Sequence, residues 1–208
     1  GLTDARLRLT MTPGELPREQ SEGNGHSGAT VIITAGPVKS YPVELYQSGM
    51  RVCVCPYKQS RFDPLAGHKT LSYFPRLLEM KHAAQKKCNE ALWFNTDNQL
   101  AEGSICNVFV VKNGVVMTPP LDTPALPGTV RDAVVEFGGT AGIVLEERAI
   151  DIEMLLSADE VFLTGSVLEV MPVTAVEKHQ VGNGLPGDMT QKISQLYRKL
   201  VEQECAAR

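Results

Sequence analysis

A short hairpin near the middle of the chain is the feature that most constrains the fold. Two apolar runs, residues 107–112 and 115–118, are separated only by Asn113 and Gly114. Asn-Gly between apolar runs is the strongest short-range signal for a tight turn joining two antiparallel strands. Further β-branched runs and amphipathic segments surround this hairpin, so the sequence predicts an α+β protein with a mixed sheet.

Apolar periodicity and the Gly, Pro and polar residues between periodic segments predict the other elements. Further strands are expected at residues 7–12, 30–35, 51–55, 91–95, 143–147 and 160–163. The first main helix is expected to be capped by Ser72 and to fade at residues 86–87. A second helix is expected at residues 130–137, closed by Gly138 and Gly139. Asp151 is expected to cap a helical turn that runs to residue 156, and a final amphipathic helix is expected at residues 188–205.

Composition excludes several classes of function. The net charge of −4 and the pI near 5.6 argue against a nucleic-acid-binding protein, since such proteins carry basic patches. No apolar run approaches the roughly 18 residues of a membrane span. The five cysteines are scattered without metal-ligand spacing, which predicts no metal site and a reduced, cytoplasmic protein.

The lysine at position 69 is the first candidate catalytic residue. It lies in Gly-His-Lys-Thr-Leu-Ser-Tyr (residues 67–73), between apolar residues 65–67 and Leu71. An amine sheltered from water by such neighbours stays partly unprotonated and nucleophilic near neutral pH. The alternative is an ordinary solvated lysine, which is the commoner case.

A lone carboxylate, Glu102, follows in Ala-Glu-Gly-Ser-Ile-Cys-Asn (residues 101–107). A lysine amine together with a carboxylate that keeps a ring nitrogen protonated is the minimal equipment for pyridoxal phosphate chemistry. The alternative for Glu102 is a turn carboxylate beside Gly103. Ser104 and Asn107 are expected to fix the local backbone.

Two segments further along the chain suit a phosphate group. The helix that opens at Gly128-Thr129-Val130 offers free backbone amides and the positive end of its dipole. The turn Thr164-Gly165-Ser166, directly after a strand, offers amides and a hydroxyl. Each segment alone is equally compatible with an ordinary structural turn.

These segments together resemble the class IV aminotransferases, the fold-type IV pyridoxal phosphate enzymes. The family includes branched-chain aminotransferases, D-amino acid aminotransferases and aminodeoxychorismate lyases. The likeness extends from about residue 43 to the C-terminus. It rests on four motifs in family order, namely His-Lys-Thr-Leu-Ser-Tyr, Ala-Glu-Gly-Ser-Ile-Cys-Asn-Val-Phe, Leu-Pro-Gly-Thr-Val-Arg-Asp and Thr-Gly-Ser-Val-Leu-Glu-Val-Met-Pro-Val.

The resemblance implies a role for each candidate residue. Lys69 would form the Schiff base with the cofactor and move the proton between the substrate α-carbon and the cofactor C4′. Glu102 would hold the ring nitrogen, and Tyr73 would hydrogen-bond the ring hydroxyl. The remaining roles would be ring packing by Leu126, phosphate binding by Ser166 and the amides of Thr129 and Val130, and substrate-carboxylate binding by Gly165, Ser166 and Val167.

The resemblance also implies a domain organisation. Residues 43–208 would form the large cofactor-binding domain, a mixed sheet or pseudo-barrel with flanking helices. Residues 36–42 would be a linker, and residues 1–35 would be the remnant of a truncated N-terminal small domain. A departure lies at the second helix, where Gly128-Thr129-Val130-Arg131 swaps the aliphatic residue and the threonine usual in the family.

The predicted function is a pyridoxal phosphate-dependent transfer of an amino group between an amino acid and a 2-oxo acid, carried out by a homodimer. Two alternatives stay open. One is an aminodeoxychorismate lyase that releases pyruvate with the same lysine. The other is a non-catalytic fragment or degenerate relative that keeps the fold.

Overall fold

The structure, a computed structural model, describes residues 5–13 and 28–206 and divides the chain into two compact units, Gly1–Ser40 and Tyr41–Arg208. The first unit contains β1 (Ala5–Thr12) and β2 (Thr30–Pro37), an antiparallel pair with Leu9 opposite Ile33. Both strands were predicted from the sequence. Residues directly opposite each other share a face of such a pair. One face is therefore apolar throughout, formed by Leu7, Leu9, Met11, Val31, Ile33 and Ala35.

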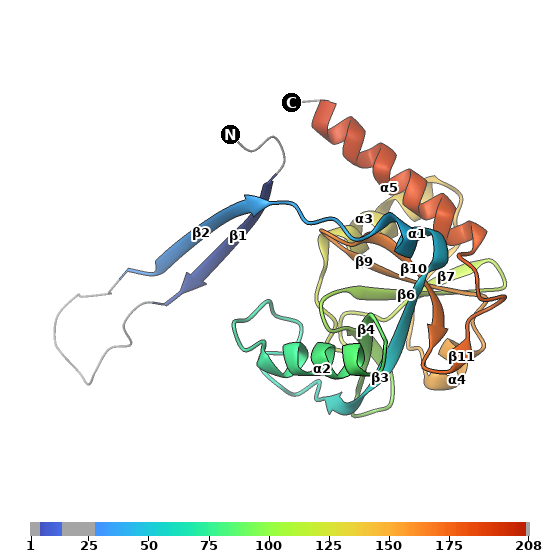
Figure 1. Cartoon of the computed structure of the whole chain (residues 1–208), viewed down its shortest axis with the longest axis horizontal. Helices are drawn as coiled ribbons and strands as arrows, with labels where there is room; N and C mark the ends of the chain where they lie inside the picture. The colour runs from blue at the N-terminus through green and yellow to red at the C-terminus, as the bar shows by residue number, and fades with distance from the viewer. Residues whose placement is uncertain (1–4, 14–27, 207–208) are drawn as a thin grey trace. The chain divides into compact units, whose positions relative to one another are not determined.

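The second unit is built on one mixed sheet of nine strands (Figure 1). They are β3 (Met50–Gln59), β4 (Glu90–Asn95), β5 (Leu100–Gly103), β6 (Asn107–Lys112), β7 (Val115–Thr118), β8 (Leu145–Glu147), β9 (Glu160–Gly165), β10 (Glu169–Val176) and β11 (His179–Gln180). Their order is β5-β4-β3-β10-β9-β6-β7-β8, with β11 paired to β10. β3 runs parallel to β4 and to β10, and β7 runs parallel to β8. The other pairs are antiparallel.

Five helices flank this sheet: α1 (Val43–Ser48), α2 (Phe74–Gln85), α3 (Thr129–Thr140), α4 (Ile152–Leu156) and α5 (Asp188–Ala206). The mixed sheet with flanking helices confirms the predicted α+β class. None of the helices in the described ranges is long and apolar enough to cross a membrane.

The core forms on both faces of the sheet because successive strand residues point to opposite faces. Phe109 and Phe162 face α3 and α5, and their rings stack with centroids 4.8 Å apart. Their neighbours Val108 and Leu163 face the other way, into the larger apolar cluster that also holds Leu155 of α4.

Two predicted helix boundaries are wrong: the cap of the first main helix at Ser72, and the end of the next helix at Gly138 and Gly139. Tyr73, not Ser72, precedes α2, and no side chain caps that helix. α3 continues through Gly138 and Gly139 to Thr140. An added Cβ at Gly138 would lie only 3.3 Å from Leu145, so this glycine allows close packing of the helix on β8.

The glycine that follows the end of α3 is instead Gly142, two residues after Thr140, and its φ of +67° suits the left-handed residue found just past a helix. The amide of Ile143 donates to the Gly138 carbonyl, as in a Schellman motif. Ile143 therefore belongs to the helix-ending motif and not to a strand. β8 begins at Leu145, two residues later than predicted. By contrast, the Asp151 cap is confirmed, since its carboxylate accepts from the Met154 amide at 2.8 Å.

Candidate functional site

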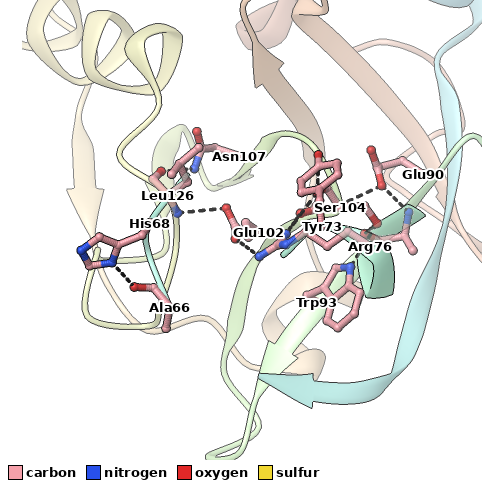
Figure 2. Close-up of polar contacts among 12 residues, drawn as sticks. Ala66, His68, Tyr73, Arg76, Glu90, Trp93, Glu102, Ser104, Asn107 and Leu126 are labelled. Carbon is pink, nitrogen blue, oxygen red and sulfur yellow. Dashed lines mark hydrogen bonds and ion pairs between the residues drawn. The ribbon is translucent and has the colours of Figure 1, made fainter. Parts of the chain in front are cut away.

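The centre of the site is the carboxylate of Glu102, which is only 4 % exposed. β5 places it opposite Trp93 of β4. One carboxylate oxygen forms an ion pair with Arg76 of α2, and the other accepts from the Leu126 amide at 2.9 Å. Figure 2 shows the carboxylate held between these two donors. Glu102 is therefore a buried strand residue, and the alternative of an open turn carboxylate is wrong.

Tyr73, just before α2, lies against the turn that follows Glu102. Its hydroxyl donates to the Ser104 carbonyl at 3.2 Å, and burial raises the pKa of this phenol. The Ser104 hydroxyl accepts from the Trp93 indole at 3.0 Å. Ser104 thus fixes the turn that follows Glu102, as the sequence predicted, and Tyr73 reaches that turn from the residue just before α2 (Figure 2).

A second buried carboxylate, Glu90, supports this turn from β4. One of its oxygens accepts from the amides of Ala91 at 2.8 Å and Ser104 at 3.0 Å. The other faces the Cys106 thiol at 3.6 Å. Burial raises the pKa of Glu90, although the two amides oppose the rise, and burial also raises the pKa of Cys106 well above its usual range.

Asn107 connects the turn to the segment that leads into α3. Its side-chain amide donates to the Leu126 carbonyl at 2.8 Å, so Leu126 is tied to Glu102 through its amide and to Asn107 through its carbonyl. A Cβ at Gly128 would collide with the Asn107 side-chain oxygen. Asn107 therefore fixes the local backbone as predicted, and it sets where the first turn of α3, with Thr129 and Val130, begins.

Thr164, Gly165 and Ser166 lie at the end of β9. Thr164 pairs directly with Asn107 of β6, so both side chains are on the face that α3 covers. The Thr164 hydroxyl is fully buried and, among the described residues, has no hydrogen-bond partner. Gly165 lies close to the turn after Glu102, since an added Cβ would be 3.7 Å from the Ile105 carbonyl oxygen. Ser166 is exposed, and Val167 is half-buried.

Lys69 does not have the shelter that its sequence neighbours predicted. Its side chain is exposed, and within residues 5–13 and 28–206 no hydrogen bond or ion pair involves its amine. The predicted burial is wrong because Leu65 and Leu71 are themselves 49 % and 58 % exposed. The lysine segment nevertheless lies beside the site, since an added Cβ at Gly67 would be 3.5 Å from the Ala125 carbonyl oxygen.

The structure thus brings Tyr73, Glu102 and Leu126 into one hydrogen-bonded cluster, with the start of α3 and the turn after β9 attached to it. The lysine segment borders this cluster. Sequence reasoning missed Arg76 and Glu90. A signal for Arg76 was available, because a basic residue in the first turn of a helix opposes the helix dipole. Glu90 gave a weaker signal, as a charge directly before a buried apolar run.

Comparisons with known proteins place the chain in a family. The sequence model of the family described as amino-transferase class IV matches residues 1–176. The branched-chain-amino-acid aminotransferase of Escherichia coli K12 is 32 % identical over 199 residues, which cover 94 % of this chain and 64 % of that protein. The D-alanine aminotransferase of Bacillus licheniformis is 29 % identical over 203 residues, which cover 98 % of this chain and 70 % of that enzyme.

The fold agrees with the sequence match. The crystal structure of the Escherichia coli branched-chain amino acid aminotransferase superposes with a TM-score of 0.85 and 31 % identity, over 94 % of this chain and 65 % of that one. The chain therefore belongs to the class IV aminotransferase family, whose members depend on pyridoxal 5′-phosphate. It spans about 64 % of the length of the Escherichia coli enzyme.

The buried Glu90 carboxyl predicts a pH-dependent effect on stability. Its pKa is higher in the folded protein than the ordinary value of 4.5, so the stability it contributes is present below that value and is lost as the pH rises through the folded value. Glu90→Gln removes this loss, while its side-chain oxygen can still accept from the two amides. We expect the free energy of unfolding of Glu90→Gln, relative to the unmodified protein, to rise as the pH increases from about 4 to about 8.

Urea unfolding at several pH values measures this effect, and Glu136→Gln is the control because Glu136 is exposed on α3. A stability difference that stays constant over the pH range would show that Glu90 titrates alike in the folded and unfolded chains.

Proposed function

We propose that this chain provides the cofactor-binding and catalytic core of a pyridoxal phosphate-dependent aminotransferase that moves an amino group between an amino acid and a 2-oxo acid. The observation that carries the proposal is the buried Glu102 carboxylate, held in the same cluster as Tyr73 and Leu126. Burying a carboxylate costs free energy, and here that cost is offset by an ion pair and a hydrogen bond that hold the group in one place. Family membership supports the same assignment.

The residues present fit the cofactor. Each Glu102 oxygen has one donor, and a carboxylate has about four acceptor positions, so a protonated ring nitrogen can still bind. The Tyr73 hydroxyl donates to the Ser104 carbonyl, and its oxygen can still accept a hydrogen bond from a ring hydroxyl. Leu126 is half-buried beside Glu102 and can pack on the ring. When bound, pyridoxal phosphate supplies an electron sink for the substrate α-carbon.

The phosphate group would bind at the start of α3. The amides of Thr129 and Val130 belong to the first turn, where backbone donors lack helical acceptors and the dipole favours an anion. These amides do not depend on side-chain identity, so the swapped order of Thr129 and Val130 leaves them in place. Ser166 would add a hydroxyl from the turn after β9. The Thr164 hydroxyl, which has no partner among the described residues, lies on the sheet face that α3 covers and is a further donor from the same predicted turn.

Lys69 would attach the cofactor covalently, take the proton from the substrate α-carbon and return it at the cofactor C4′. The turn of Gly165, Ser166 and Val167 would bind the substrate carboxylate. Because Lys69 is exposed, its amine would need cover from the cofactor and from another part of the assembly to exclude water.

The unpaired state of all five cysteines supports the prediction of a cytoplasmic location.

We also propose a homodimer in which a second copy covers the surface around Lys69. Large apolar side chains lie on both sides of the lysine in the sequence and are exposed, at 81 % for Phe62 and 72 % for Phe74. Leu77, one turn after Phe74 on α2, is 52 % exposed. Exposed apolar side chains that gather in one region are typical of a protein interface.

The lyase and the non-catalytic relative remain alternatives, and no observation favours either.

Reduction with borohydride in the presence of pyridoxal 5′-phosphate tests the lysine. We expect the mass of a reduced cofactor adduct on the peptide that contains Lys69, and amino transfer from a branched-chain amino acid to 2-oxoglutarate. Lys69→Ala should lose the adduct and at least about a hundredfold of the transfer rate, because the attaching and proton-moving amine is removed. Lys199→Ala, an exposed lysine of α5, is the control.

An adduct on another lysine, or none, would contradict the proposal. Pyruvate release from aminodeoxychorismate without amino transfer would support the lyase, and neither activity would support the non-catalytic relative.

Thr164→Val tests the phosphate site. Since the buried Thr164 hydroxyl has no partner among the described residues, its loss should stabilise the cofactor-free protein by about 1 kcal/mol. The affinity for pyridoxal 5′-phosphate should fall, and the affinity for pyridoxal, which lacks the phosphate, should not. Urea unfolding and absorbance titration measure the two effects.

Thr118→Val is a matched control, because the Thr118 hydroxyl is equally buried but donates to the Val108 carbonyl at 2.9 Å. Thr118→Val should therefore destabilise the protein. If Thr164→Val destabilises it to the same extent, the Thr164 hydroxyl has a structural role and the phosphate assignment for it is wrong.

Sedimentation analysis tests the homodimer. The unmodified protein should sediment as a dimer at micromolar concentration, and the double variant Phe74→Glu, Leu77→Glu should sediment as a monomer, because two buried charges would oppose association. Leu185→Glu is the control, as Leu185 is 64 % exposed ahead of α5. A monomeric unmodified protein, or a double variant that stays dimeric, would contradict this interface.

A further inference from the structure

Arg76 has a position that helix energetics do not explain. It lies in the first turn of α2, where the positive end of the helix dipole disfavours a cation, and no acidic residue in that turn offsets it. Its side chain is 20 % exposed, so the charge is also largely removed from water. A cation kept in such a place requires strong compensating contacts elsewhere.

The hydrogen bonds and the ion pair of Arg76 all go to three consecutive residues of the site, 102–104. One terminal nitrogen donates to the carbonyls of Gly103 at 2.9 Å and Ser104 at 3.2 Å. The other forms the ion pair with Glu102. The guanidinium carbon also lies 5.5 Å from the centroid of the Trp93 ring, within cation–π range. A planar guanidinium that binds a carboxylate and two adjacent carbonyls fixes the orientation of all three groups.

Glu102 is therefore clamped from two directions. Arg76 holds one carboxylate oxygen, and the Leu126 amide holds the other. A carboxylate with one donor on each oxygen cannot rotate about its last bond without losing a hydrogen bond. The acceptor positions that the two donors leave free then point in one fixed direction.

We propose that Arg76 is a positioning residue for the cofactor ring: it fixes the Glu102 carboxylate in the orientation that binds the ring nitrogen. This inference rests on the proposed function, because it needs a ring nitrogen opposite Glu102. The competing explanation is a purely structural ion pair that attaches α2 to β5. The two differ in one respect, since only a positioning role makes Arg76 matter more for a ring that carries a nitrogen than for one that does not.

The test compares two ligands on each protein. One is pyridoxal 5′-phosphate, and the other is its analogue with a C–H group in place of the ring nitrogen. Absorbance titration gives both dissociation constants for the unmodified chain, Arg76→Met and Arg76→Lys. We expect the unmodified protein to prefer the nitrogen-containing ligand and Arg76→Met to lose about tenfold of that preference, the order expected for a charge-assisted hydrogen bond.

Arg76→Lys keeps the charge without the planar fork, so its preference should lie between the other two. It also keeps the experiment decisive if Arg76→Met does not fold, as judged by circular dichroism and urea unfolding. Arg198→Met is the matched control, because Arg198 also contacts a carboxylate, Glu169 at 3.3 Å, and an aromatic ring, Tyr46 at 5.9 Å. Its removal should leave the preference unchanged.

Two outcomes would overturn the inference. If both ligands weaken equally in the Arg76 variants, the ion pair is purely structural, although the proposed function stands. If the preference for the nitrogen increases, Arg76 competes with the ring for Glu102 instead of positioning it. Failure of the unmodified protein to bind either ligand would overturn the proposed function itself, which separates that failure from the first two.

Discussion

The interaction on which the site depends is the burial of the Glu102 carboxylate between a guanidinium and a backbone amide. Removing a carboxylate from water costs several kcal/mol, and the cost is offset only when the charge is paired and the oxygens are hydrogen-bonded. Both conditions hold here, since Arg76 pairs one oxygen and Leu126 donates to the other. Each donor comes from a different part of the chain, so this one group ties together α2, β5 and the segment before α3.

The sheet register explains why the polar groups collect where they do. β6 and β9 pair so that Phe109 meets Phe162 in the core, and two residues along on the same face Asn107 meets Thr164. The apolar face thus ends in a polar pair at the edge of the core. Beside that pair, the segment of residues 126–128 delivers the first turn of α3. The packing that stabilises the helix therefore also fixes where its free amides lie.

Local chemistry predicted the elements that are decided locally. Asn113 and Gly114 both have positive φ, 51° and 78°, as a type I′ turn requires, and the hairpin they predicted is present. Asp151 caps α4 for an equally local reason. The positions of Tyr73, Glu102 and Leu126 in one cluster agree with what the family motifs implied. Their roles toward the cofactor stay predictions.

Properties decided by distant residues were not predicted. Gly138 was predicted to end the helix, yet the helix continues through it and Leu145 of β8 packs closely against it. Arg76 reads as one more charge on a helix, because its partners at residues 102–104 are neighbours only in space. The exposure of Lys69 was not predicted for the same reason, because it depends on where the neighbouring side chains lie in the fold. Apolar residues next to a lysine in sequence shelter it only if they are themselves buried, and Leu65 and Leu71 are not.

Glu102 and Lys69 lie at two ends of the proposed site, and a single chain completes the surroundings of the first but not of the second. The difference has a physical basis. A buried carboxylate must have its partners in place before any ligand arrives, because without them it would be an unpaired charge in a low-dielectric interior. Glu102 meets this condition within a single copy of the chain. An amine on the surface costs nothing while water solvates it, so Lys69 can be exposed in a single chain. The cofactor and the second copy of the proposed dimer would then cover Lys69, whereas the surroundings of Glu102 are already formed by the fold of one chain.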